Sequence, residues 1–434
     1  MPVCRIKSSF SIARGRSIGL LAVLFLASGS VFAQSYDNPG IGEKPVASHP
    51  QDYKPLGVRA GAFMLHPGVE LAAQWHDNIL YTFDNELSDL IWHVRPYITA
   101  LSNWSNHSVS IRAAADIARY SDYGFRDYED YFLQLTGQVD VSSRDVFYYG
   151  ADYMQLHEER NVRSDEQGIK PTTYTMTGGY AGYDHLFNRF SAGVYLGMRK
   201  LDYDNNVRQD GTIIDNQDRD RSDNEISARF GYQFQTDKMA FVDIGYETVD
   251  YRLDQDRNGY DRASSGLFVG AGLDFTITGV LRGDVYARYS SREYDDPLLP
   301  DVDGWGLGGG LQWMPTMLTS VRLNLETGIQ DTTQATASGY VRNMYALRVD
   351  HELLRNLQLS GQLSYYTNDY QLLPDAPEGA RKSDTYFTAD VGATYFFNRW
   401  AWLSASYKYG TFDTNVEFDD FEANSAWLVL GFER

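Results

Sequence analysis

The chain has 434 residues, a formal net charge of −20 at pH 7 and one cysteine, Cys4. So acidic a chain is not expected to bind nucleic acid, because the phosphate backbone repels it. Since the only cysteine lies among the first few residues, the rest of the chain cannot form disulfides, use a thiol in catalysis or ligate metal through cysteine.

The start of the chain has the pattern of a secretory signal peptide. Basic residues precede an apolar stretch at 18–25, and Val31 and Ala33 occupy the two positions that a signal peptidase recognises. A membrane anchor is the alternative, but the apolar stretch is short and no stop-transfer sequence follows it. The predicted divisions are a signal peptide at 1–33, a periplasmic N-terminal segment at 34–66 and an outer-membrane barrel at 67–434.

From about Val69 onward, apolar and polar residues alternate in runs that are separated by turns. In the run 321–326, valine and leucine at the odd positions alternate with Arg322, Asn324 and Glu326. The same period of two extends over other runs, for example 190–199, 357–365 and 401–409. This period predicts β-strands with one apolar and one polar face, and helical spacing fits none of these runs.

The connections between the runs alternate between short and long. Short turns are predicted near residues 142, 187, 236, 278, 315, 353 and 397. Long loops are predicted at 78–89, 157–171, 202–220, 254–260, 294–301, 369–380 and 412–420. This asymmetry is typical of bacterial outer-membrane barrels. The predicted fold class is all-β: a closed antiparallel transmembrane β-barrel of about 18 strands (range about 16–18), with short periplasmic turns, long extracellular loops and both termini in the periplasm.

A soluble β-sandwich or propeller is the structural alternative, since sandwich strands alternate too. Runs of about 12–15 residues are long for a sandwich and match a tilted membrane span with extensions. In hydrocarbon the last strand must pair with the first, and the run 426–432 supplies an apolar face that ends in Phe432. It resembles the terminal signal read by the barrel-insertion machinery, except that Glu433 and Arg434 follow the aromatic residue.

The polar faces of the predicted strands carry charges of both signs. The predicted pore-lining residues are Arg95, Arg112, Asp116, Asp152, Arg199, Arg229, Asp243, Glu247, Arg282, Asp284, Arg288, Arg322, Glu326, Arg342, Arg348, Asp390 and Lys408. Burying so many charges requires pairing or water, and a barrel of this size is wide enough for an aqueous channel. Two interpretations stay open: a hydrated pore that contacts a polar solute, or ion-pair ladders that hold the wall in shape.

Aromatic residues also fall on the inward faces of the predicted strands. They are Tyr97, Tyr148, Tyr195, Tyr286, Tyr366 and Trp402. Such rings are candidates for sliding contacts with sugars, or for packing within the wall.

Catalysis and metal binding find little support in the sequence. The histidines are scattered, and no catalytic or phosphate-binding motif occurs, so we expect neither an enzyme nor a cofactor. The segment 254–259 matches the start of an EF-hand calcium loop, but Ser265 stands where that loop needs a bidentate glutamate. We therefore expect no metal site there.

Specific motif-like segments occur near the N-terminal end of the predicted barrel. They are YKPLGVRAGAFMLHP at 53–67, HDNIL at 76–80, SDLI at 88–91, VRP at 94–96 and WSNH at 104–107. This series resembles the type-2 beta-barrel porin family of Gram-negative outer membranes, whose members often lie in exopolysaccharide gene clusters. The resemblance implies an outer-membrane barrel and a part in moving polysaccharide to the cell surface. It supplies no catalytic motif.

The leading functional hypothesis is therefore a conduit for exopolysaccharide across the outer membrane. The alternatives are a general diffusion porin for small solutes and a surface structural or adhesive barrel. The partners expected are outer-membrane lipid and lipopolysaccharide, the barrel-insertion machinery, periplasmic polysaccharide export proteins and the polysaccharide itself.

Overall fold

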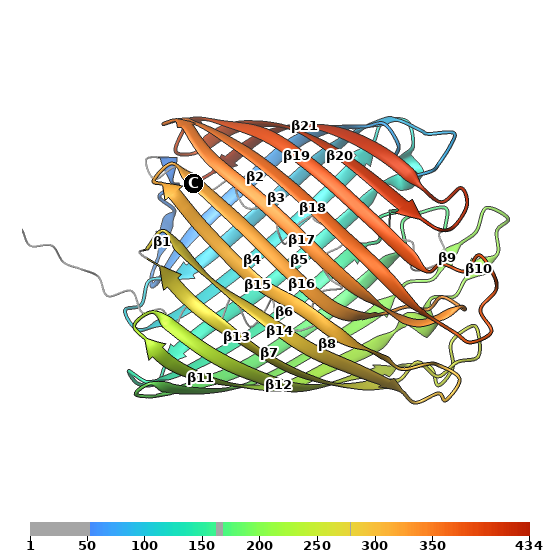
Figure 1. Ribbon diagram of the computed structural model, residues 1–434. Coiled ribbons are helices and arrows are strands. Elements are labelled where there is room, and N and C mark those ends of the chain that lie inside the picture. The colour runs from blue at the N-terminus through green and yellow to red at the C-terminus, as the bar shows by residue number, and fades with distance from the viewer. Residues whose placement is uncertain (1–52, 162–167, 278) are drawn as a thin grey trace, which may run out of the picture.

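The computed structural model describes residues 53–161, 168–277 and 279–434. In this part of the chain, eighteen long antiparallel strands form one closed sheet (Figure 1). They are β2 (Phe63–His76), β3 (Asp89–Ser102), β4 (His107–Tyr120), β5 (Tyr128–Asp140), β6 (Asp145–His157), β7 (Thr173–Phe187), β8 (Phe190–Tyr203), β11 (Arg221–Gln235), β12 (Lys238–Tyr251), β13 (Ser264–Ile277), β14 (Leu281–Tyr294), β15 (Val302–Thr316), β16 (Thr319–Asp331), β17 (Ala337–Leu354), β18 (Leu357–Leu372), β19 (Ser383–Asn398), β20 (Ala401–Thr414) and β21 (Phe421–Glu433). The predicted fold class is confirmed.

Three short strands complete the description. Strand β1 (Val58–Ala60) pairs with β2, while β9 (Asn206–Val207) and β10 (Ile213–Ile214) form a hairpin within a loop. Single 3-10 turns lie at Gly124–Arg126 and Gln217–Arg219. Within the described residues, no helix is long and apolar enough to span a bilayer.

The barrel closes between its first and last strands. Strand β2 pairs with β3 on one side and with β21 on the other, from Gly68↔Glu433 to His76↔Ser425. A free strand edge would leave backbone N–H and C=O groups without partners in hydrocarbon. The sequence from Ala426 to Phe432 therefore acts as the closing strand that its alternation predicts.

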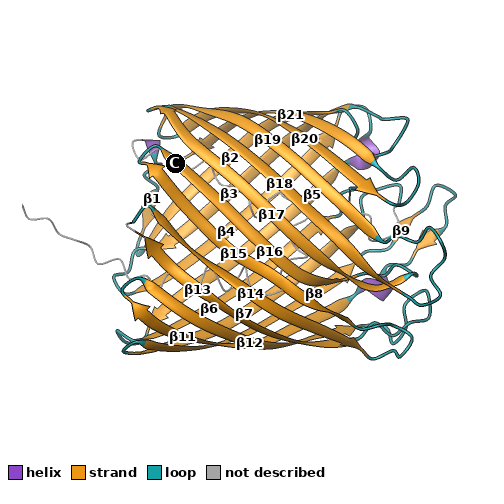
Figure 2. Ribbon diagram, in the orientation of Figure 1, coloured by secondary structure: helices purple, strands orange, loops and turns teal. Residues whose placement is uncertain are grey.

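The two rims of the barrel differ in the length of their connections (Figure 2). At one rim, which we name the turn rim, the strand bounds leave turns of two to four residues. At the other, the loop rim, the connections have five to seventeen residues. This asymmetry is the predicted one, with two differences. The loops at 121–127 and 332–336 and the turn at 103–106 were not predicted, and two turns lie at 317–318 and 355–356, about two residues later than predicted.

The predicted boundary at residue 67 is wrong, because it falls inside β2. This strand begins at Phe63 and pairs with β3 from that residue onward. Pro67 is accommodated within β2 because it precedes Gly68, the first residue that pairs with β21, so its missing N–H removes no bond from that ladder. The predicted signal peptide and the segment 34–52 lie outside the described residues.

Each strand exposes apolar side chains on one face and buries mainly polar ones on the other. In β3, Trp92 and Val94 are exposed, whereas His93 and Arg95 are buried. An apolar outer surface around a closed sheet suits contact with lipid hydrocarbon. The polar face is therefore the inner wall of the barrel.

Candidate functional site: the inner wall of the barrel

The inner wall carries every predicted pore-lining residue, because each has the strand parity opposite to the exposed apolar side chains. Contacts across an intervening strand confirm this orientation. Arg288 on β14 forms an ion pair with Asp243 on β12 by passing over Gly270 on β13. A Cβ atom on Gly270 would lie 2.3 Å from Asp243 Oδ1, so only glycine leaves room for this contact. Whether a solute passes these residues stays a prediction.

From β8 to β16 the inner wall is packed with buried ion pairs near the loop rim. Arg199 Nη2 lies 2.7 Å from Asp223 Oδ2, and Arg292 lies 3.1 Å from Glu247 and 2.6 Å from Asp331. All of these side chains are less than a tenth exposed. For this part of the wall the ion-pair ladder is the correct interpretation, since pairing offsets the cost of burial.

Three partners in this ladder, Asp223, Arg292 and Asp331, were not among the predicted pore-lining residues. They lie close to the strand ends, where the predicted loops interrupt the alternation. Extending the parity of Arg229 along β11 and of Arg288 along β14 to their loop-rim ends would have identified Asp223 and Arg292.

The inner wall of β16 and β17 is more accessible than the ion-pair ladder. The side chains of Arg322 and Arg348 are 39% and 23% exposed, compared with 2% for Arg199. Both arginines bind Asp350, at 2.7 Å and 2.9 Å. Because two guanidinium groups share one carboxylate, this part of the wall keeps a positive charge.

The opposite side of the wall is acidic. Counting from β2, strands β5 to β7 are fourth to sixth in the ring and β16 to β18 are thirteenth to fifteenth. Each strand of one group is therefore nine positions, half the ring, from its counterpart in the other. The inward residues of β5 to β7 include Asp140, Asp152 and Asp184, and these strands contain no lysine or arginine. Carboxylates therefore face Arg322 and Arg348 across the barrel.

The inward aromatic residues pack within the wall. Tyr148, Tyr195 and Trp402 are only 6%, 4% and 3% exposed, so the hypothesis that they are sliding contacts for sugars is wrong. Trp402 covers Gly431, where a Cβ atom would lie 2.1 Å from the ring. Tyr366 lies between the Tyr386 ring, at 4.9 Å, and the Arg342 guanidinium, also at 4.9 Å.

Tyr97 and Tyr286 are packed in a similar way. Each ring lies over a glycine of the neighbouring strand, Gly68 and Gly308 respectively. The Tyr97 hydroxyl also donates a hydrogen bond to Glu433, at 2.7 Å. The packing alternative therefore describes all six predicted aromatic residues better than the sliding contact does.

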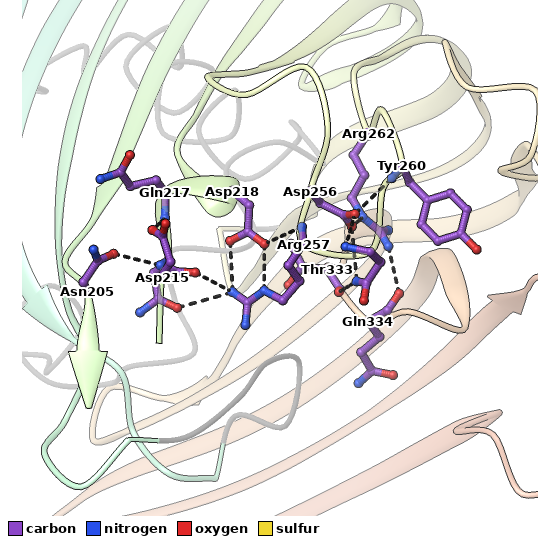
Figure 3. Close-up of polar contacts among 12 residues, drawn as sticks. Asn205, Asp215, Gln217, Asp218, Asp256, Arg257, Tyr260, Arg262, Thr333 and Gln334 are labelled. Carbon is purple, nitrogen blue, oxygen red and sulfur yellow. Dashed lines mark hydrogen bonds and ion pairs between the residues drawn. The ribbon is translucent and has the colours of Figure 1, made fainter. Parts of the chain in front are cut away.

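At the loop rim, polar contacts tie three loops together (Figure 3). Arg257 in the loop 252–263 binds Asp218 in the loop 204–220, with Nε 2.7 Å from Oδ2. Arg262 donates to Asp256 and to the carbonyl oxygens of Thr332 and Gln334 in the loop 332–336. Burial alone would raise the pKa of Asp218, but the hydrogen bond and charge of Arg257 lower it below its usual value.

Residues 254–259, which match the start of an EF-hand loop in sequence, do not have the structure of a calcium-binding loop. The carboxylate of Asp256 accepts hydrogen bonds from the backbone N–H groups of Asn258 and Tyr260 and from the Arg262 side chain. The flanking segments are strands, and the described residues contain no group of three or more histidine, cysteine or acidic residues placed to hold a metal ion.

The loop after β6 reaches across the interior. Asn161 Nδ2 contacts the Tyr386 hydroxyl on β19 at 3.4 Å, although β6 and β19 are seven strands apart around the closed ring. Glu159 in the same loop lies 3.4 Å from His157 Nε2. Burial would raise the pKa of Glu159, but His157, with Arg126 and His76 nearby, lowers it to about 2. This loop therefore narrows the barrel near the loop rim.

Apolar side chains anchor other loops to the inner wall. Leu299 and Leu373 come from different loops, are almost fully buried and pack in one cluster with Ile329 and Val302. Ile79 packs against Ile91 and Ala118 in another cluster. Burying such side chains favours the inward position of the loops by about 1.5–3 kcal/mol for each large side chain.

A closed barrel with an apolar outer face and a charged, loop-narrowed interior defines an outer-membrane porin. More specifically, the chain belongs to the family described as "Putative beta-barrel porin 2", whose family model matches residues 49–434. The resemblance seen in the sequence is thus confirmed.

Several solved outer-membrane proteins are similar to this chain at low sequence identity. Pseudomonas aeruginosa OccK3 (OpdO) is 13% identical, with a TM-score of 0.40 over 85% of this chain and 95% of that one. The outer membrane protein OpdK from the same organism is 11% identical, with a TM-score of 0.43 over 85% and 99%. A mutant of its ferric enterobactin receptor PfeA is 6% identical, with a TM-score of 0.44 over 85% and 80%. No match was found among curated protein sequences.

Proposed function

We propose that this porin lets small hydrophilic solutes diffuse across the outer membrane. The observation that supports the proposal best is the exposure of Arg322 on the inner wall, because a guanidinium that is 39% exposed is in contact with water. A polar solute can diffuse through the barrel only where the lumen contains water, and the exposure of Arg322 indicates such water beside β16.

The loop rim supports a limit on solute size. Residues 158–161, directly after β6, reach β19, and polar contacts join the loops 204–220, 252–263 and 332–336. A polymer could pass only if these contacts opened. In the orientation that we propose, the turn rim faces the periplasm and the loop rim faces the outside.

Liposome swelling tests this function directly. Vesicles that contain the purified protein should swell in small sugars, and the rate should fall steeply as the sugar becomes larger. Planar bilayers should show a stable ionic conductance. Vesicles that swell no faster than protein-free ones, together with bilayers without conductance, would contradict the proposal.

Export of exopolysaccharide is the second candidate. Besides the family resemblance, one structural observation favours it. The inner face of β18 presents alternating amides and hydroxyls at Gln358, Ser360, Gln362 and Ser364, which suit sugar hydroxyl groups. Deleting the gene should then abolish surface polysaccharide while polymer accumulates in the periplasm. Unchanged surface polymer would reject this candidate and leave the diffusion porin intact.

A further inference from the structure

Strand register aligns a series of polar side chains along the inner wall. Each member lies directly opposite the next in the hydrogen-bonded ladder. The series, which we name the polar track, is Arg282, Gln312, Arg322, Arg348, Gln362, Asp390, Lys408, Ser425 and His76, on β14 to β21 and then β2. Neighbouring strands are about 4.8 Å apart, so the members follow one another at short intervals.

The polar track climbs from one rim to the other. Arg282 is the second residue of β14, close to the turn rim, whereas His76 is the last residue of β2, at the loop rim. The reason is geometric: the strands of a barrel are tilted, so a row of paired residues perpendicular to them rises around the wall. The tilt is evident in Figure 1. A single row therefore spans the height of the barrel.

The polar track differs from the ion-pair ladder in accessibility. From Arg282 to Lys408 every member of the track is partly exposed. Only Ser425 and His76, which lie nearest the loop rim, are buried. By contrast, Arg288 and Arg292 in the ladder have side chains only 7% and 3% exposed. The cations of the track can thus contact a solute even where Arg322 and Arg348 share Asp350, whereas those of the ladder are buried together with their carboxylates.

The charge of the polar track is positive. It contains Arg282, Arg322, Arg348 and Lys408 against one carboxylate, Asp390, with Asp350 and Asp284 beside it, so the cations exceed the carboxylates by one. The acidic loops give the whole chain its negative charge, but salt screens charges beyond about 8 Å at physiological ionic strength. The local field along the track is therefore set by the four cations.

We infer that the polar track binds small organic anions bearing carboxylate groups and passes them between its cations. Guanidinium groups bind carboxylates in a bidentate manner, and the intervening amides of Gln312 and Gln362 can hold the anion between them. The carboxylates of β5 to β7 repel the same anion only close to the opposite wall, which leaves the track as the favoured side. This inference names the substrate class of the proposed porin and rests on that function.

The test is ion selectivity in planar bilayers. In a KCl gradient the zero-current potential should show that chloride permeates better than potassium. The double variant Arg322→Gln/Arg348→Gln should lower the permeability ratio by roughly twofold for each charge removed. Arg119→Gln removes an outward-facing arginine of β4 and should leave the ratio unchanged. Heat-modifiable migration in gels verifies that each variant forms a barrel, and Lys408→Gln is a second variant if the double one does not fold.

Uptake into proteoliposomes completes the test. Succinate should enter faster than a neutral solute of similar size, and the advantage should disappear in the track variants. A protein that conducts but has no preference for chloride or succinate, or variants that keep the preference, would overturn the polar track and leave the porin function standing. Failure of any conductance would instead overturn the proposed function.

Discussion

Arg322 on β16 and Arg348 on β17 lie directly opposite each other in the strand ladder and share the carboxylate of Asp350. Like charges in directly opposite positions destabilise a sheet. The carboxylate of Asp350 offsets this repulsion because it forms an ion pair with both arginines. The arrangement also leaves both guanidinium groups partly exposed to the lumen. Stability and solute contact therefore depend on the same three side chains.

Replacing this shared carboxylate should affect stability and selectivity in opposite directions. Asp350→Asn keeps the volume but leaves Arg322 and Arg348 facing each other without compensation, which should cost about 1–2 kcal/mol of folding free energy. The same change makes the wall more positive, so preference for chloride should increase. Urea unfolding in lipid vesicles and bilayer selectivity measure the two effects. Asp254→Asn, on an exposed loop, is the control and should change neither. Equal stability of Asp350→Asn and the parent chain would argue against this account of the pair.

Gly270 should be more sensitive to substitution than a glycine with open surroundings. Gly270→Val would place a side chain where Arg288 reaches Asp243, and breaking this buried pair should destabilise the barrel by about 3–5 kcal/mol. Gly304→Val is the matched control, since no atom lies within 4 Å of the added Cβ. Unfolding by urea compares the two. A similar loss for both would show that the contact across β13 contributes little.

Much of the barrel was predictable from the sequence, because its side chains obey the strict period of two. That period identifies the strands, and the parity of Arg95, Asp243 or Lys408 assigns each to the inner wall. The predicted start of the barrel at residue 67 falls inside β2, because the alternation is clear only from about Val69 whereas the strand begins at Phe63.

Accessibility of the charged residues could not be predicted in the same way. Arg288 and Arg322 occupy equivalent inward positions, yet one is paired across a glycine and the other is open to the lumen. The difference in exposure between the two arginines depends on which side chains meet across an intervening strand. The alternation within a single strand does not contain this information. The aromatic rings were ambiguous for the same reason, since glycines on neighbouring strands decide whether a ring such as Trp402 packs into the wall.

The contacts that join the loops should survive mild acid and fail only in strong acid. The pKa of Asp218 is lowered, and that of Glu159 is lowered to about 2. A carboxylate with a depressed pKa stabilises the folded loops fully above its unfolded value of about 4, and this contribution is lost as pH falls toward the folded value. Conductance should therefore not respond to these groups between about pH 5 and pH 8.

Limited proteolysis with pepsin can measure this opening. Cleavage within the loop 204–220 should become rapid only when the pH falls below the usual pKa range of an aspartate, because the pKa of Asp218 is lowered. Arg257→Gln removes the partner of Asp218 and should expose the loop at higher pH. Rapid cleavage of the parent chain near pH 5 would contradict the role given to these ion pairs.

The orientation of the barrel can be tested with single cysteines, because the only native cysteine, Cys4, lies within the predicted signal peptide. Leu298 is 65% exposed in the loop 295–301, and Ser143 is exposed in a turn at the opposite rim. In intact cells a membrane-impermeant maleimide should label Leu298→Cys but not Ser143→Cys, since only the loop rim is expected to face the outside. Permeabilised cells should label both variants, which verifies that a cysteine at the turn rim can react. Labelling of Ser143→Cys alone in intact cells would place the loops in the periplasm and reverse the direction in which the polar track rises.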